Sequence, residues 1–322
     1  MDALSGLLDG PRADGAFLMR SIFRSPWSLR IQDEAPLSIA VVARGQAWVM
    51  SGDVPPVHLE PGDVLIASGP KPYTVADLPD TEPLFFINPG QACTDAMGRS
   101  MSAEMMLDTR AWGNDPAGST VLVTGTYEHA SAVSERLLRS LPPLIVLSHD
   151  QWNSTLVTLL CEEVQRDELG QDVFLDRLLD LVVMAAVRAW FARPDTRSPG
   201  WFVANSDPVV GPALRLLHEH VSRPWTVAAL AAAVGVSRAA FARRFTELMG
   251  EPPMAYLTTW RLALAADLLL RTDRTIGSIA AEVGYSTPFA LSAAFTRVRG
   301  VSPAQYRTRT RAAGPEQQRV GR

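Results

Sequence analysis

The sequence predicts an α+β protein of several domains, with a β-rich N-terminal domain, a helical segment and an all-α C-terminal domain. Three observations carry this prediction. The chain has 322 residues, which is the length of two ordinary domains. Short apolar stretches separated by turns fill residues 38–88, whereas apolar residues recur at helical spacing from residue 153 onward. The last third of the chain also contains an internal repeat.

The composition is that of a globular chain, with 47% apolar and 20% charged residues. No apolar run reaches the roughly 18 residues of a membrane-spanning helix. The acidic start at Asp2 is unlike a secretory signal, which needs basic residues there. Two cysteines, Cys93 and Cys161, cannot form a disulfide framework, which is typical of a reducing cytosol. We therefore expect a cytoplasmic protein without a membrane partner.

Residues 1–148 are expected to form the β-rich domain. Its strand-like stretches are separated by turn sequences rich in Gly, Pro and Asp, which indicates a sandwich or barrel rather than alternating β–α units. These stretches cover 39–42, 47–50, 64–67, 84–87 and 121–127. A helix is predicted over 131–141 and ends at Pro142 and Pro143, because proline cannot continue a helix.

The segment 149–193 is expected to be helical. Apolar residues at helical spacing predict two helices on either side of Gly170. The helices span 153–166 and 172–191. They form either the contact surface of a homodimer or a cover for the open side of the β-rich domain. Residues 194–206 contain Pro, Gly, Ser and Asp and indicate a linker, and residues 312–322 are expected to be a disordered tail.

Charge is divided unequally along the chain. Residues 1–206 contain 15 basic and 26 acidic side chains, a net charge of −11, whereas residues 207–311 contain 13 arginines and 7 acidic side chains, a net charge of +6. A basic C-terminal third attached to an acidic body indicates a partner that carries phosphates. RNA, DNA and an anionic membrane surface all satisfy this pattern.

The basic third contains two copies of one pattern. Four residues of the first copy recur 49 residues later, and four more recur 50 residues later. The pairs are Ala231/Ala280, Val234/Val283, Gly235/Gly284, Ser237/Ser286, Phe245/Phe295, Gly250/Gly300, Pro253/Pro303 and Tyr256/Tyr306. The slip of one residue falls in the turn after the glycine, where an insertion is tolerated. Eight matches in order indicate a duplicated structural unit.

Each copy is predicted to be a helix-turn-helix, over about 226–248 and 275–299. Ser, Thr and Gly stand where helix caps and a turn are needed. These residues are Thr226, Gly235 and Ser237 in the first copy and Thr275, Gly284 and Thr287 in the second. Between the copies, a helix with an apolar stripe from Leu257 to Leu268 is expected to set the spacing of the two motifs.

The second helix of the first copy has two different faces. Phe241, Phe245 and Leu248 lie within roughly 60° of one another and are expected to pack on the preceding helix. The opposite face is left free to enter a major groove. That face carries Ala239, Arg243 and Thr246.

This arrangement resembles the AraC/XylS family of bacterial transcription regulators over residues 207–311. The resemblance rests on the first-copy series from Gly235 to Pro253 and on the run Gly-Tyr-Ser…Phe…Gly-Val-Ser-Pro-Ala-Gln-Tyr-Arg from Gly284 to Arg307. It implies a sequence-specific, ligand-responsive, one-component regulator that places two recognition helices in successive major grooves of double-stranded DNA. It also implies a protein that is not an enzyme, needs no cofactor and works with RNA polymerase. An architectural DNA-bending protein would leave the N-terminal domain without a role.

By this resemblance, the second helix of each copy carries the DNA contacts. Arg243 matches a position where the family commonly contacts bases, and arginine binds guanine O6 and N7 with two hydrogen bonds; a phosphate contact or a solvated side chain is the alternative. Arg238 and Arg244 are expected to touch phosphate or a neighbouring acid. Ala293 stands where relatives often have arginine, so the second copy is expected to contribute shape fit and phosphate contacts. The expected DNA-contacting residues are Ser237, Arg238, Ala239, Ala242, Arg243, Arg244, Thr246, Thr287, Phe289, Ala290, Ala293 and Arg297.

Phe289 has two interpretations of equal weight. Its place on the outward face allows contact with thymine methyl groups. Alternatively, its ring packs against the neighbouring helix.

The N-terminal part resembles the cupin-type sensor domain of some family members, with the sequence LEPGDV over 59–64 as the turn into a barrel strand. This resemblance implies a cupin-like β-barrel with an unknown small-molecule effector inside it. The residues expected to line the effector pocket are Trp48, His58, Tyr73 and Phe86.

A cupin metalloenzyme fused to a nucleic-acid-binding domain is the first alternative. His58 and Glu60 would share one face of a strand, but two ligands make a poor metal site. Tyr73 stands where metal-binding relatives carry histidine. His129 and His149 have no evident partners in the sequence. We therefore expect no metal and no catalysis.

A cysteine-based redox-sensing regulator is the second alternative. Residues 1–5 and the strand before Pro142 are similar to a subgroup that includes a reactive-chlorine sensor, but that subgroup has a cysteine where this chain has Thr124. A redox-sensing thiol needs a low pKa, exposure and usually a second thiol that resolves the oxidised form. Cys93 is the candidate and is expected to be partly exposed, whereas Cys161 is expected in the core.

Overall fold

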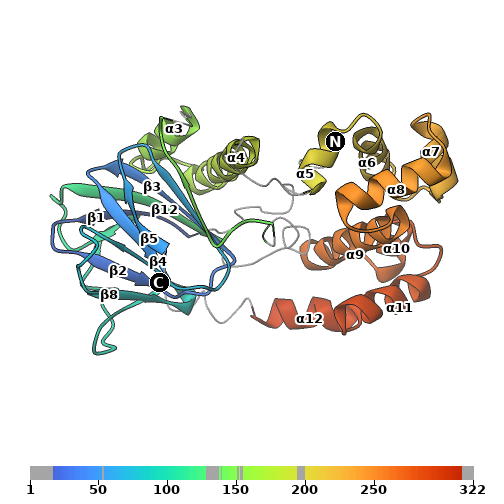
Figure 1. Cartoon of the computed structure of the whole chain (residues 1–322). Coiled ribbons are helices and arrows are strands. Elements are labelled where there is room, and N and C mark those ends of the chain that lie inside the picture. The colour runs from blue at the N-terminus through green and yellow to red at the C-terminus, as the bar shows by residue number, and fades with distance from the viewer. Residues whose placement is uncertain are drawn as a thin grey trace. The chain divides into compact units, whose positions relative to one another are not determined.

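The computed structural model describes residues 17–52, 54–127, 138, 140–150, 152, 155–193 and 200–313. Most of the helix predicted over 131–141 lies outside these residues, as do His129 and residues 314–322 of the predicted tail. The described residues form a β-rich unit, up to Arg193, and a helical unit, from Gly200 onward (Figure 1). The predicted α+β fold class is confirmed, because all strands of the described residues lie in the first unit and the second contains helices.

Two sheets make up the β-rich unit. One has seven strands in the order β10-β11-β1-β12-β3-β6-β13, and the other has six in the order β5-β4-β7-β2-β8-β9. The strands are β1 (Phe17–Phe23), β2 (Ser28–Ile31), β3 (Leu37–Arg44), β4 (Ala47–Ser51), β5 (Val54–Leu59), β6 (Val64–Ser68), β7 (Tyr73–Ala76), β8 (Phe85–Asn88), β9 (Ala92–Asp95), β10 (Met106–Asp108), β11 (Ala111–Gly113), β12 (Thr120–Tyr127) and β13 (Leu144–Leu147). The five predicted stretches correspond to β3, β4, β6, β8 and β12.

The core of this unit contains large aromatic side chains from several segments. Phe23 stacks on the indole of Trp27 with ring centroids 4.7 Å apart, and Trp112 meets Phe23 edge-on at 5.6 Å. Because successive side chains of a strand point to opposite faces, strands that line this core contribute alternate residues to it. In β4 these are Ala47 and Val49.

Two helices follow the strands of this unit, α3 (Thr155–Glu163) and α4 (Gln171–Ala192). The apolar side of α4 covers the face of the seven-stranded sheet that points away from the core (Figure 1). A Cβ built on Gly125 of β12 would lie 2.6 Å from Leu179 Cδ1, and the Tyr127 hydroxyl donates to Asp180 Oδ1 at 3.1 Å. The glycine therefore allows helix and sheet to approach closely.

Eight helices form the described part of the helical unit. They are α5 (Gly200–Ser206), α6 (Val210–Glu219), α7 (Val227–Ala233), α8 (Arg238–Met249), α9 (Pro253–Arg271), α10 (Ile276–Glu282), α11 (Pro288–Arg299) and α12 (Pro303–Ala313). The prediction of a linker over 194–206 is wrong for α5. Ala204 is fully buried, and a Cβ on Gly200 would overlap the carbonyl oxygen of Leu248 in α8. Tertiary packing thus makes a helix of a segment whose composition indicates a loop.

The helices α7 and α8 form the first predicted helix-turn-helix, and α10 and α11 form the second. The predicted caps are confirmed, because each side-chain oxygen accepts the backbone N–H three residues later at 3.1–3.2 Å. The capping residues are Thr226, Ser237, Thr275 and Thr287. Both recognition helices end at a glycine with φ of +73°. The two copies therefore share their backbone design.

Candidate functional site

The outward face of α8 is polar and exposed. Phe241 and Phe245 are fully buried on the inward face, as predicted, while Leu248 is half-buried. Arg243 lies on the opposite face with 77% of its side chain exposed, and its Nε is 3.8 Å from Glu247 Oε1. An ion pair this exposed contributes little to stability. The Arg243 guanidinium is therefore available to a ligand approaching this face.

The outward face of α11 has a different chemistry. Phe289 is 84% exposed, so the interpretation in which its ring packs against the neighbouring helix is wrong. Ala290 and Ala293 are exposed beside it, and Arg297 is an exposed cation near the end of the helix. This face offers apolar contact surface with a single positive charge.

Several other expected contact residues have roles within the helices. Ser237 and Thr287 cap α8 and α11, which places both exposed side chains at helix N-termini, where backbone N–H groups favour an anion such as phosphate. Arg238 and Ala239 are exposed in the first turn of α8, whereas Ala242 is half-buried. The exposed Thr246 donates its hydroxyl to the Ala242 carbonyl at 2.8 Å.

The expected effector pocket is not formed by the four predicted residues. Tyr73 packs against the core, and burial raises its pKa. Trp48, His58 and Phe86 lie on the other face of the six-stranded sheet, because their strand neighbours fill the core. Trp48 and His58 are register partners with ring centroids 4.7 Å apart. Their placement in a barrel interior was therefore wrong.

The thiols have the opposite properties to those that redox sensing requires. The expectation that Cys93 is partly exposed is wrong, since it is only 3% exposed and belongs to the core between the strands. Burial raises the pKa of Cys93 to about 11. Cys161 is half-buried in α3, and burial raises its pKa to about 11 as well. Both sulfurs are thiols near neutral pH, whereas the reactive form is the thiolate.

His149 has partners that the sequence did not reveal. Its Nδ1 is 3.1 Å from Oδ1 of the buried Asp63, and its Nε2 is 3.1 Å from Asp150 Oδ1. The hydrogen bond to Asp63 raises the pKa of His149. Among the residues that the structure describes, His, Cys, Asp and Glu nowhere gather in groups of three or more that could hold a metal ion. Within the same residues, no helix is long and apolar enough to span a membrane.

Comparison with known proteins covers both units. A family described as "Cupin" matches residues 2–192, and a family described as "Helix-turn-helix domain" matches residues 230–309. An AraC-like transcription regulator of Streptomyces lividans is 30% identical over 286 residues, which are 87% of this chain and 90% of that protein. This chain belongs to the AraC family of transcription regulators.

Other relatives of this AraC-type protein match it over shorter stretches. The regulator AlkR of Acinetobacter baylyi is 36% identical over 53% of this chain and 58% of its own length. The activator RclR of Escherichia coli, described as specific for RCS, is 30% identical over 61% of this chain and 71% of its own length. Among solved structures, the DNA-binding domain of AdpA in complex with a target DNA is 36% identical, covering 34% of this chain and 98% of that chain with a TM-score of 0.33.

This chain is therefore an AraC-type DNA-binding transcriptional regulator with a cupin-like domain. One of its expected DNA contacts is occupied within the protein. Arg244 donates to Asp207 from Nε at 2.9 Å and from Nη2 at 2.6 Å. Asp207 also accepts the backbone N–H groups of Val209 and Val210, each at 2.9 Å. The Arg244 guanidinium and these N–H groups lower the pKa of Asp207 to about 2. Arg244 is expected to touch either phosphate or a neighbouring acid, and in the structure it binds the acid Asp207.

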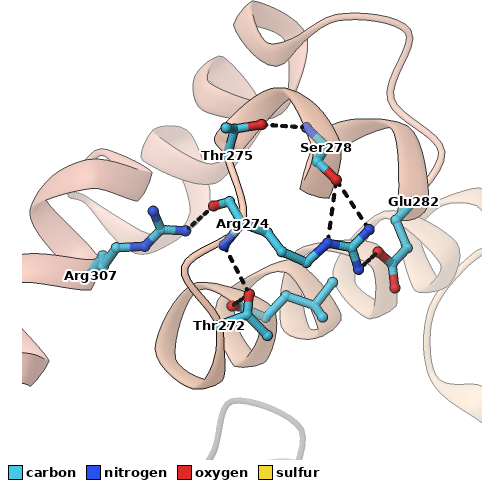
Figure 2. Close-up of polar contacts among 7 residues, drawn as sticks. Thr272, Arg274, Thr275, Ser278, Glu282 and Arg307 are labelled. Atoms are coloured by element: carbon cyan, nitrogen blue, oxygen red, sulfur yellow. Dashed lines mark hydrogen bonds and ion pairs between the residues drawn. The ribbon is translucent and has the colours of Figure 1, made fainter.

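Arginines outside the recognition helices hold the turns that precede the two motifs, a role that the sequence pattern does not predict. Figure 2 shows Arg307 of α12 donating to the carbonyl oxygen of Arg274, at 2.6 Å. Its Nε donates to the Leu269 carbonyl at 3.1 Å. Arg274 forms an ion pair with Glu282 and donates to Ser278 Oγ beside the cap of α10 (Figure 2). The start of the second motif is thus fixed by guanidinium groups.

The equivalent turn of the first motif is held by Arg261 of α9. Its Nε and Nη2 donate to the Val221 carbonyl at 2.9 and 2.7 Å, and Nη2 also donates to the Arg223 carbonyl at 2.8 Å. The only sequence signal for this role is a cation next to Trp260, one of the apolar residues whose spacing predicts the buried stripe of α9.

Proposed function

We propose that this AraC-type regulator reads DNA sequence mainly through α8, with Arg243 binding a guanine in one major groove. The helix α11 enters the next groove and contributes shape fit and phosphate contacts. The observation that carries this proposal is the exposure of Arg243 on the face opposite the buried Phe241 and Phe245. An exposed arginine on such a face has the geometry for two hydrogen bonds to guanine.

The chemistry of α11 supports the unequal division of roles. Ala293 and Phe289 make no hydrogen bonds to base edges, but apolar side chains contact thymine methyl groups. The net charge of +6 on residues 207–311 supplies the phosphate attraction for both halves.

Selection of duplexes from a random pool by the full-length chain tests this proposal. We expect a site of about 20 base pairs with two half-sites roughly one helical turn apart, and an affinity that falls steeply with salt. Arg243→Ala is expected to cost about 1–3 kcal/mol and to relax preference at one guanine. The matched control Arg238→Ala is expected to weaken all sequences equally. Equal loss on all sequences from Arg243→Ala would reassign Arg243 to phosphate, and failure to select any sequence would contradict the proposal.

The cupin-like unit is proposed to bind a small-molecule effector without forming a covalent bond to it. Trp27 supports this proposal, because its indole N–H is buried and has no hydrogen-bond partner among the described residues. Such a donor costs about 1–3 kcal/mol unless an acceptor meets it. Native mass spectrometry of the protein purified from its host tests for a bound compound, and Trp27→Phe is expected to weaken its retention. The effector should change DNA affinity about 5–150-fold.

We further propose that the regulator is a cytoplasmic homodimer that recruits RNA polymerase. The outward side of α4 supports dimerisation, because Val173, Phe174 and Leu181 are 65%, 49% and 46% exposed there. Leu181→Glu is expected to shift sedimentation equilibrium toward monomers, whereas Glu104→Arg, at an exposed position outside α4, is not.

The purified full-length protein also tests the two alternative functions, the cupin metalloenzyme and the cysteine-based redox-sensing regulator. A binding protein without catalysis should purify with well under one metal ion per chain, and chelators should leave its DNA binding intact. Stoichiometric zinc or iron together with turnover of a small molecule would favour the metalloenzyme. Cys93→Ser is expected to keep regulation, since the thiol is buried and protonated. Loss of an oxidant response in this variant would favour the redox-sensing regulator.

A further inference from the structure

The turns of the two motifs meet at the side chain of Arg261. On one side, this guanidinium donates three hydrogen bonds to carbonyls of the turn before α7. On its other side lies Gly284, the turn residue between α10 and α11. A Cβ built on Gly284 would be 2.6 Å from Arg261 Nη2 and 2.8 Å from the Cα of Ser222 in the first turn. One side chain of the connecting helix therefore contacts both motifs.

The first copy has no such contact at the matching position. Gly235 and Gly284 are equivalent in the repeat and both have positive φ, +72° and +87°. A Cβ on Gly235 would meet nothing within 4 Å. Backbone conformation alone thus explains the glycine of the first copy, whereas the second also needs space for Arg261 and Ser222. This asymmetry marks the Arg261 contact as a contact between the motifs.

We propose that Arg261 is a positioning residue that sets the separation and angle of α8 and α11, and thereby the spacing of half-sites that the regulator accepts. The inference rests on the proposed reading of two successive grooves. A planar guanidinium with five donors can hold several carbonyls in a fixed arrangement, which a lysine ammonium cannot reproduce. The helix α9 carries this group as part of a 19-residue rod.

Arg307 provides a matched control, because it uses the same chemistry within one half of the unit. Its guanidinium bonds the Leu269 and Arg274 carbonyls, which both precede the second motif. Replacing Arg307 by lysine should weaken the fold without loosening the first motif against the second. A merely structural role for Arg261 predicts the same result for Arg261→Lys.

Half-site spacing separates the two roles. The probe is the duplex that the full-length wild-type chain selects from a random pool, together with versions in which one base pair is inserted or deleted between the half-sites. One base pair changes their separation by about 3.4 Å and their rotation by about 34°. We expect the wild type to lose about tenfold or more in affinity on the altered duplexes, and Arg307→Lys to keep this ratio. Arg261→Lys should bind the original duplex less tightly than the wild type does. Its further loss of affinity on the altered duplexes should be about threefold or less.

A second pair of variants decides the question if Arg261→Lys does not fold. Gly284→Ala pushes a methyl group against Arg261, whereas Gly235→Ala imposes similar backbone strain in open space. Relaxed or shifted spacing preference in Gly284→Ala but not in Gly235→Ala would support the proposal. If the folded Arg261→Lys variant, or Gly284→Ala, loses as much affinity on the altered duplexes as the wild type does, the proposal is overturned. A wild type that selects a sequence but tolerates altered spacing would overturn it too, whereas a wild type that selects no sequence contradicts the proposed function itself.

Discussion

The two helix-turn-helix motifs have nearly the same backbone and very different surfaces. In both, a hydroxyl caps the recognition helix, a phenylalanine fills the core and a left-handed glycine ends the helix. Positions 50 residues apart then differ on the outside, where Arg243 and Arg244 in α8 correspond to Ala293 and Ala294 in α11. The comparison shows that the residues that build a recognition helix and those that give it specificity are separable sets.

The largest expected effect tests the buried residues that both recognition helices share. Phe245→Ala and Phe295→Ala should each cost about 3–5 kcal/mol of unfolding free energy, because both side chains are fully buried. Phe245 should cost more, since its ring contacts the rings of Phe241 and Tyr256, whereas among the described residues the ring of Phe295 contacts that of Tyr306. Urea unfolding followed by ellipticity measures both losses. The exposed Phe289→Ala is the control and should change stability by less than about 0.5 kcal/mol. A comparable loss there would contradict the division between building and reading residues.

The next effect concerns the two turn glycines. Each Ala substitution forces a side chain into the left-handed region, at a cost of about 1–2 kcal/mol. Gly284→Ala should cost roughly 1 kcal/mol more than Gly235→Ala, because the new methyl group also meets the Ser222 backbone and Arg261. The difference in urea midpoint between the two variants measures this excess. Equal losses of stability would show that Arg261 and Ser222 can move away from the new methyl group without a measurable cost in unfolding free energy.

The surface difference can be reduced by giving α11 the residue that α8 has. Ala293→Arg should strengthen DNA binding by about 1 kcal/mol through an added cation near phosphate and base edges. Preference in the half-site read by α8 should change little, because Arg243 is untouched. Competition titrations with duplexes altered in one half-site at a time provide the measurement. A change of preference in the α8 half-site would show that the two helices do not read independently.

Much of this architecture could be predicted from the sequence, because its causes are local. The caps at Ser237 and Thr287 follow from side-chain type, and the buried face of α8 follows from helical spacing. Arg261 and Arg307 could not be found in this way. The two arginines hold equivalent turns, but they do not occupy equivalent positions in the repeat. The residue 50 positions before Arg307 is Leu257, not Arg261. Only the tertiary approach of the turns creates their function.

The β-rich unit shows a second limit. The strand β4 reads Ala-Trp-Val-Met over residues 47–50, so both of its faces are apolar and alternation cannot say which side faces the core. In the structure Ala47 and Val49 fill the core, which leaves Trp48 on the other face of the sheet. The helix α5 was missed because the close approach of Gly200 to α8 depends on residues far away in the sequence.

The smallest expected effect is a pH dependence that one motif has and the other lacks. Asp207 ties α8 to α6 through Arg244, whereas the matching position in α11 is Ala294. The folded-state pKa of Asp207 is about 2, below its ordinary value of 3.8. Its contribution to stability is therefore fully present above about pH 4 and is lost as the pH falls through about 2. Asp207→Asn should cost about 0.5–1 kcal/mol at pH 7, since half of the Arg244 side chain is solvated. The difference in urea stability between wild type and this variant should shrink as the pH falls from 4 toward 2. Arg243→Gln is the control, because its ion pair with Glu247 is exposed and its loss should leave stability nearly unchanged. A difference for Asp207→Asn that stays constant down to pH 2.5 would show that the carboxylate charge does not hold α8 in place.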